Sequence, residues 1–143
     1  MATLLLLNGP NLNLLGQREP AIYGATTLPQ IEETVRRMVE KAGHVLRCFQ
    51  SNSEGVMVDW VQQNRDADFL LINAGAYTHT SVALRDAIKM TGIRTLEIHI
   101  SNVHAREPFR HHSYLADIAV GVIAGFGPMG YELATLYALR QLG

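Results

Sequence analysis

Asn11, Arg18 and Tyr23 are residues of types that bind anions, polarise oxygen atoms or transfer protons. They lie in the segment from 8 to 24, which is much longer than the roughly 2–6 residues that usually join a strand to a helix. Glycines at both ends of this segment could act as hinges. Each residue alone could be an ordinary turn residue, but together they predict a catalytic lid over about residues 11–24.

His99 and Glu97 are polar side chains in a run that otherwise predicts a buried strand. A strand inside a parallel sheet is usually apolar on both faces. An edge-like strand or a hydrogen-bonded core histidine would explain His99, and so would a catalytic role. Because His99 lies near the carboxyl end of its run, where such sheets bind ligands, we favour a catalytic role, with Glu97 orienting the imidazole.

Polar residues also follow the preceding apolar run, from Asn73 to Ser81. A strand is expected to end here and a helix to begin. Free backbone N–H groups at a helix N-terminus, together with polar side chains, suit an anionic or polyhydroxylated ligand.

The stretch from His104 to His112 is rich in histidine and arginine. Such a cluster could indicate a metal site, but no acidic or cysteine ligand has convincing spacing, and arginine is a poor neighbour for a cation. We therefore predict that Arg106 and Arg110 bind an anion, and that no metal is bound. His111 and His112 are expected at the surface or in an interface.

Short apolar runs alternate with helical patterns along the chain. The runs predict strands at Thr3–Leu7, Val45–Phe49, Phe69–Ile72, Thr95–Ile100 and Ile118–Ala124. Helices are expected between them and at the end, capped by Thr27 with Gln30, by Asn52 or Ser53, by Thr80 or Ser81, and near Pro128. This alternation predicts an α/β fold with a single domain over residues 1–143: a flavodoxin-like, five-stranded parallel sheet with helices on both faces. The polar segments described above should then meet at the carboxyl ends of the strands.

Composition excludes several classes of protein. The formal net charge is −1, so there is no global basic surface for nucleic acid. Cys48 is the only cysteine, which favours a reducing compartment. No apolar stretch approaches the roughly 20 residues that span a bilayer, and the N-terminal run lacks the features of a signal peptide. We expect a cytoplasmic protein with no membrane partner.

Two features concern the C-terminal part. The stretch Gly125–Gly130 matches G-x-G-x-x-G, but no second strand with an acidic residue follows, so we predict close helix packing and no NAD or FAD. The last helix is apolar around most of its circumference, which suggests that another copy of the chain covers it. On pattern alone, Arg85, Asp86 and Lys89 are expected on a solvated helix face.

These segments together resemble the type II 3-dehydroquinases, over essentially the whole chain. The stretches that carry the resemblance are Asn8–Gly16, Arg18–Gly24, Asn73–Asp86 and Glu97–Arg110, followed by His112-Ser113-Tyr114. The resemblance implies a flavodoxin-like fold and a dodecamer built from trimers. It also implies conversion of 3-dehydroquinate to 3-dehydroshikimate and water in the shikimate pathway, with no cofactor.

The resemblance also implies roles for single residues. Tyr23 would be the base, which requires nearby cations because a free tyrosine has a pKa of about 10. Arg18 would stabilise the transition state, Asn11 the enolate oxygen with a bound water, and His99 would be the general acid. Arg106 and Glu97 would support them. Substrate binding would fall to Asn73, His79, Asp86, Ile100, Ser101 and Arg110, with Asp86 reaching a neighbouring subunit's site.

Two alternatives remain open at this stage. A different dehydratase or isomerase could use the same tyrosine, arginine and histidine on another hydroxy acid. A flavodoxin-like binding or signalling module is the other, although a phosphoacceptor domain would need acidic residues where Asn8 and Asn73 stand. A flavin carrier would need a Ser- and Thr-rich loop after the first strand, unlike Leu12–Leu15.

Overall fold

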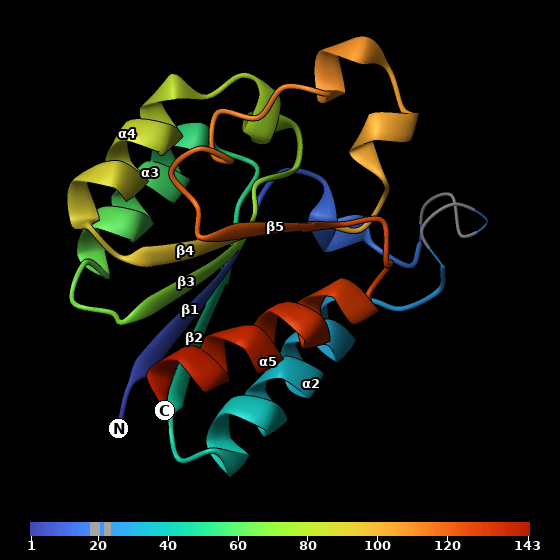
Figure 1. The fold of residues 1–143 in the computed structure, drawn as a ribbon. Helices are drawn as coiled ribbons and strands as arrows, with labels where there is room; N and C mark the ends of the chain where they lie inside the picture. Colours follow the sequence, from blue (N-terminus) through green and yellow to red (C-terminus); the bar gives the residue numbers. More distant parts are fainter. Residues whose placement is uncertain (18–20, 22–23) are drawn as a thin grey trace.

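Five parallel strands form one sheet in the order β2-β1-β3-β4-β5, in a computed structural model that describes residues 1–17, 21 and 24–143 (Figure 1). The strands are β1 (Thr3–Asn8), β2 (Val45–Gln50), β3 (Phe69–Asn73), β4 (Arg94–His99) and β5 (Gly121–Ala124). Each strand pairs in parallel with its neighbours. The strand order reverses at β1, so the loops after β1 and β3 are adjacent. This is the flavodoxin-like order, and it confirms the predicted fold class.

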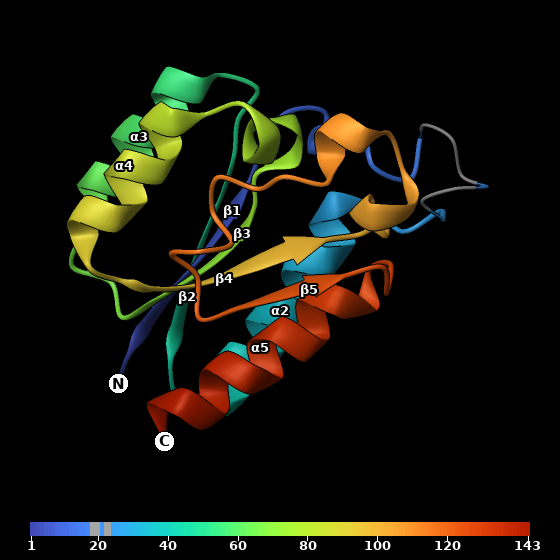
Figure 2. The ribbon, with the colours of Figure 1, turned by 45° about the horizontal axis from the view of Figure 1, so that its top comes forward.

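Helices cover both faces of the sheet (Figure 2). Helices α2 (Leu28–Lys41) and α5 (Met129–Leu142) lie on one face, and α3 (Glu54–Gln63) and α4 (Val82–Thr91) on the other. Successive side chains of β1 point to opposite faces of the sheet. Leu4 and Leu6 belong to the core beneath α2 and α5, while Leu5 and Leu7 belong to the core beneath α3 and α4. Because both faces are buried, the strand is a continuous leucine run.

The helix starts follow the predicted caps. Thr27 and Gln30 form a reciprocal capping box at α2, and the hydroxyls of Ser53 and Ser81 accept backbone N–H groups at α3 and α4. At the other end of α4, Gly92 has a φ of 70°, which is the left-handed conformation expected of a C-terminal glycine. Local sequence was sufficient for these boundaries.

The fifth strand begins later than predicted. It starts at Gly121, because the backbone N–H groups of Ile118 and Ala119 both donate to the carbonyl of Leu115 and complete a turn. The apolar character of residues 118 and 119 therefore does not signal sheet pairing, and the first backbone bond to β4 is the one from the N–H of Val120 to the carbonyl of Thr95. β5 is also one of the two edge strands, and its Val122 is exposed.

Backbone conformation explains two glycines of the stretch before α5: Gly125 and Gly127 have φ values of 94° and 61°, in the left-handed region that favours glycine. A Cβ atom on Gly130, within α5, would lie 3.4 Å from Ile123 Cγ2, which is an ordinary van der Waals distance, so α5 packs closely on the sheet here. None of the helices in the described part of the chain has the length and apolar character needed to cross a bilayer.

Short 3-10 helices gather at the carboxyl edge of the sheet (Figure 1). They are η1 (Leu12–Leu14), η2 (Gly75–His79), η3 (Val103–Ala105) and η4 (Pro108–Arg110). The first follows β1, the second follows β3, and the last two follow β4. The edge where the sequence places its polar segments is thus enclosed by ordered loops.

Candidate active site

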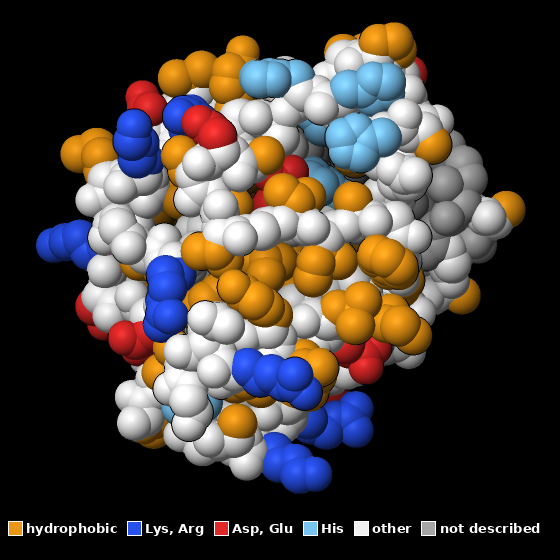
Figure 3. Space-filling view, viewed as in Figure 1, with side chains coloured by type: hydrophobic (Ala, Val, Ile, Leu, Met, Phe, Trp, Pro, Cys, Tyr) orange, Lys and Arg blue, Asp and Glu red, His pale blue; other side chains and the backbone are white. Residues whose placement is uncertain are grey.

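A cavity of about 170 Å³ opens at the carboxyl ends of the strands. Loops after β1, β3 and β4 form it, and Leu12, Leu14, Leu15 and Val103 make part of its wall apolar. It brings together most of the residues that the sequence singled out: Asn11, Asn73, His79, His99, Ile100, Ser101, Arg106 and Arg110. Histidine side chains gather at this end of the molecule (Figure 3).

Two of the other predicted site residues lie elsewhere. Asp86 is exposed on α4 and is not part of the cavity wall. Glu97 is buried behind His99. Arg18 and Tyr23 lie outside the described residues, as does part of the predicted lid. The described part of that segment contributes Asn11 and the three leucines to the cavity wall.

His99 is buried, with 5% of its surface exposed, and forms a close contact with Glu97, which is 2% exposed. The two residues lie two positions apart on β4 and therefore on the same face of the strand. Nε2 of His99 lies 2.5 Å from Oε2 of Glu97, so this nitrogen donates to the carboxylate and Nδ1 remains for the cavity. His99 is thus a hydrogen-bonded buried histidine that also reaches the cavity.

His79 ends η2, after β3, and lines the cavity next to His99. Its Nδ1–H donates to the carbonyl of His112 at 2.8 Å, and its ring stacks on that of His99 with centroids 6.2 Å apart. Burial lowers the pKa of His79, and the hydrogen bond to His112 opposes this by raising it. The nearby charges of His99 and Arg110 lower the pKa further. The neutral ring leaves Nε2 as an acceptor for a ligand hydroxyl.

Two arginines give the cavity a local positive charge that the whole chain lacks. Arg106 donates from Nη1 to Ser101 Oγ at 3.3 Å. Arg110 Nε lies 3.0 Å from Glu107 Oε1, and Arg106 Nε lies 3.7 Å from the same oxygen. Both guanidinium groups face the Glu107 carboxylate, and their planar sets of N–H donors suit an anionic ligand.

Asn11 has an unusual backbone conformation. Its φ is 70°, the only positive value at a non-glycine residue in the described part of the chain. Asparagine tolerates this left-handed conformation better than most residues. The backbone N–H of Asn11 also donates to Asn52 Oδ1 at 2.9 Å, which fixes the loop where it borders the cavity.

Tyr131 is a residue that the sequence analysis did not identify. Its hydroxyl donates to Asn8 Oδ1 at 2.6 Å and accepts from Asn73 Nδ2 at 2.9 Å, while Asn73 Oδ1 accepts the N–H of Gly75. The orientation of the Asn73 amide at the cavity is therefore set from α5. A tyrosine in an apolar helix was the only signal, and nothing local indicated its partners.

The histidines after β4 do not converge on a common point. The rings of His104 and His111 lie with centroids 6.0 Å apart, and His111 Nε2 is hydrogen bonded to the carbonyl of Arg106. Over residues 1–17, 21 and 24–143, no group of three or more potential metal ligands is found.

Comparison with known proteins places this geometry in a family. The model of the family described as "Dehydroquinase class II" matches residues 2–139. The "3-dehydroquinate dehydratase 1" of Pseudomonas aeruginosa is 58% identical, over 99% of this chain and 98% of that protein. The "3-dehydroquinate dehydratase" of Parasynechococcus marenigrum is 63% identical, over 98% of this chain and 99% of the relative.

Solved structures agree with these relatives. The type II dehydroquinase from Butyrivibrio crossotus superposes with a TM-score of 0.92 at 39% identity, over 97% of each chain. That from Propionibacterium acnes gives a TM-score of 0.91 at 39% identity, over 98% of this chain and 97% of the other.

Proposed function

This chain belongs to the class II dehydroquinase family, and on that premise we propose that it removes water from 3-dehydroquinate through an enolate intermediate, with no cofactor. This is a step of the shikimate pathway. The observation that carries the proposal is the cavity that joins the buried His99–Glu97 pair to the anion-binding side of Arg106 and Ser101. That combination suits a small acid that bears hydroxyl groups.

The reaction needs three chemical roles. A base removes the proton next to the ketone, a donor stabilises the enolate oxygen, and an acid protonates the departing hydroxide as the carbon–carbon double bond forms. The base is Tyr23 and the stabiliser of the transition state is Arg18; both roles rest on family resemblance, because these residues lie outside the described part of the chain. Asn11, with a bound water, stabilises the enolate oxygen from the loop after β1.

His99 is the acid in this proposal. Glu97 holds Nε2 at 2.5 Å, which orients the ring with Nδ1 towards the cavity, so Nδ1, when it carries a proton, can deliver it to the hydroxide that leaves. The apolar part of the cavity wall reduces the water around this proton transfer.

The polar groups of the cavity bind the rest of the substrate. Ser101 Oγ accepts from Arg106, so the serine hydroxyl keeps its own hydrogen for the substrate carboxylate, beside the backbone of Ile100. Arg110, Asn73 and His79 bind the hydroxyl groups from the other walls.

The active form is a homo-oligomer, which the resemblance suggests is a dodecamer of trimers. Asp86 is exposed on α4 and is not part of the cavity wall of its own chain, which fits a role at a neighbouring subunit's site. A cytoplasmic location also stays a prediction.

Ultraviolet absorbance tests the function directly. The EDTA-treated protein is mixed with 3-dehydroquinate, and the conjugated enone of the product should raise the absorbance where the substrate is transparent. Tyr23→Phe should abolish the rise, whereas Val56→Thr, at an exposed position on α3, should leave it unchanged. No rise with the folded wild-type protein would show that another hydroxy acid is the substrate, and loss of activity with EDTA would show that a metal takes part.

A further inference from the structure

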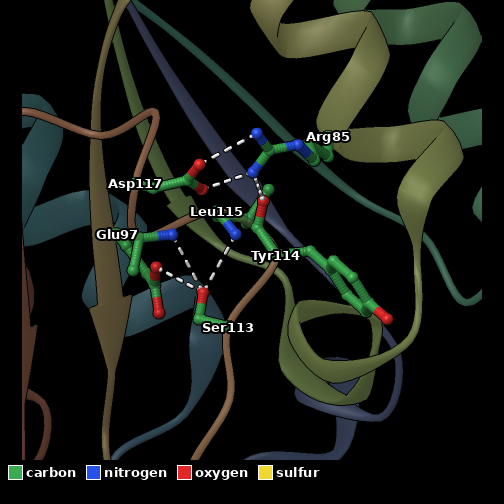
Figure 4. Close-up of polar contacts among 7 residues, drawn as sticks. Arg85, Glu97, Ser113, Tyr114, Leu115 and Asp117 are labelled. Carbon is green, nitrogen blue, oxygen red and sulfur yellow. Dashed lines mark hydrogen bonds and ion pairs between the residues drawn. The ribbon is translucent and has the colours of Figure 1, made fainter.

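Both carboxylate oxygens of Glu97 have a donor. Oε2 faces His99. Oε1 accepts the hydroxyl of Ser113 at 2.8 Å (Figure 4). The oxygen of Ser113 itself accepts the backbone N–H groups of Leu115 and Ala116, each at 3.0 Å. Because these two bonds occupy its lone pairs, the single hydroxyl hydrogen is directed at Glu97.

The turn that carries Ser113 is attached to α4. Arg85 forms a two-point ion pair with Asp117, in which Nη2 lies 2.9 Å from Oδ2, and its Nη1 donates to the carbonyl of Tyr114 at 2.8 Å (Figure 4). Paired bonds of this kind fix direction as well as distance. This contradicts the expectation that Arg85 lies on a purely solvated face.

The sheet offers Glu97 no replacement donor from its neighbours. The residues beside it on β3 and β5 are Ile72 and Val122. Among the residues that the structure describes, the charged or titratable groups that share the cavity with His99 are His79, Arg106 and Arg110, and the hydrogen bonds described for them go to groups other than the Glu97 carboxylate.

We propose that Ser113 is a positioning residue for the general acid: it fixes the Glu97 carboxylate, which fixes the tautomer and orientation of His99, and the Arg85–Asp117 pair holds the turn that makes this possible. The kinetic part of this inference rests on the proposed function. The structural part, the control of the His99 tautomer, does not.

Steady-state kinetics with 3-dehydroquinate test the kinetic part. A general acid contributes about 10²–10⁴-fold, so disorienting it without removing it should lower kcat by about 10-fold in Ser113→Ala. KM should change by less than about twofold, because the acid acts only in the transition state. Ser113→Thr keeps the hydroxyl and should restore kcat.

Ser53→Ala is the matched control. Ser53 is a serine at the start of α3, away from the cavity wall, whose hydroxyl also accepts a backbone N–H, at 3.3 Å from Val56, but it has no carboxylate partner among the described contacts. It should lose stability as Ser113→Ala does, with kcat retained. Equal kcat in the two alanine variants would overturn the proposal.

Nitrogen-15 NMR of histidine-labelled protein tests the structural part without substrate. In the wild type the His99 ring should carry its proton on Nε2, and in Ser113→Ala a population protonated on Nδ1 should appear; His99→Asn assigns the signal. An unchanged tautomer in Ser113→Ala would overturn the inference even if the chain is an active dehydratase. The measurement also stands if 3-dehydroquinate is not the substrate.

Asp117→Asn provides a variant that changes only an exposed side chain. It should lower kcat in the same direction as Ser113→Ala, by less, and should have no further effect when combined with Ser113→Ala. Additive effects of the two changes would contradict the claim that the ion pair acts through Ser113.

Discussion

The hydroxyl of Tyr131 lies between two buried asparagine amides, and Phe at this position should affect both folding and substrate binding. Burial raises the pKa of Tyr131 far above the physiological range, so the phenol stays protonated and keeps donating to Asn8. Tyr131→Phe leaves Asn8 and Asn73 each short of a partner, at a cost of about 1–3 kcal/mol in the free energy of unfolding. KM should rise with little change in kcat, because Asn73 is proposed to bind substrate in the ground and transition states alike.

Urea denaturation and steady-state kinetics measure the two effects. Thr135→Val is the control, since it removes another buried hydroxyl from α5, one that donates to the carbonyl of Tyr131 at 2.7 Å. It should reduce stability while KM stays at the wild-type value. An unchanged KM in Tyr131→Phe would show that the tyrosine has a structural role only.

His79 makes stability depend on pH. Its pKa is lowered in the folded protein, mainly by burial, so the unfolded chain binds the proton more readily. The contribution of the neutral ring is therefore fully present above the unfolded pKa of about 6.5, and is lost as the pH falls through that value towards the lower folded one. His79→Gln should flatten the acid-side decline in the free energy of unfolding, measured with urea between pH values of about 7 and 5. The exposed His104→Gln serves as control, and an equal slope in His79→Gln and the wild type would contradict the assignment.

At the scale of the elements, the loops after β1 and β3 are in direct backbone contact. Gly9 donates its N–H to the carbonyl of Asn73 at 2.8 Å, and a Cβ on Gly9 would lie 2.2 Å from the carbonyl oxygen of Ala74. Gly9→Ala must therefore separate the two loops that carry Asn11 and Asn73. We expect a loss of about 1–3 kcal/mol or more in the free energy of unfolding, with lower activity.

Thermal unfolding compares this variant with Gly55→Ala. Gly55 lies in α3 with open space where a Cβ would be, so alanine there should stabilise the protein by about 0.5–1 kcal/mol. Equal melting temperatures of the two variants would mean that the loops have room to move apart.

The elements show which parts of this fold the sequence could predict. The caps of α2, α3 and α4 depend on residues within three positions of each other, and the local sequence identified them. The start of β5 depends on a turn in which the N–H groups of Ile118 and Ala119 donate to the carbonyl of Leu115. The apolar character of these residues alone could not reveal that turn.

The same distinction applies to the site. Glu97 and His99 were found because alternation along one strand places them together. Tyr131 and Asn8 are 123 positions apart, and the Ser113–Glu97 bond joins residues 16 positions apart across a loop. Contacts of this kind arise from the packing of α5 and of the 113–117 turn against the sheet, which no local pattern describes.

For the whole molecule, apolar side chains gather over β5 and α5 (Figure 3). They are more than a third exposed, and β5 is an edge strand with unpaired backbone groups. The residues are Val120, Val122, Phe126, Met129, Leu133, Leu136 and Tyr137. A second copy of the chain would bury this surface, which fits the proposed homo-oligomer better than a monomer does.

Charges placed in this surface should therefore dissociate the assembly. We expect Val122→Lys combined with Leu136→Lys to lower the sedimentation coefficient to that of a smaller species. The reason is that a contact between copies would bury the lysine ammonium groups without an opposite charge, which is energetically costly. Val56→Lys, at an exposed valine on α3, should leave the assembly intact.

If Asp86 completes a neighbouring active site, the dissociated protein should also lose turnover, and Asp86→Ala should lose turnover while still assembling. A wild-type protein that sediments as a monomer at assay concentration would contradict the oligomer and the role of Asp86 together.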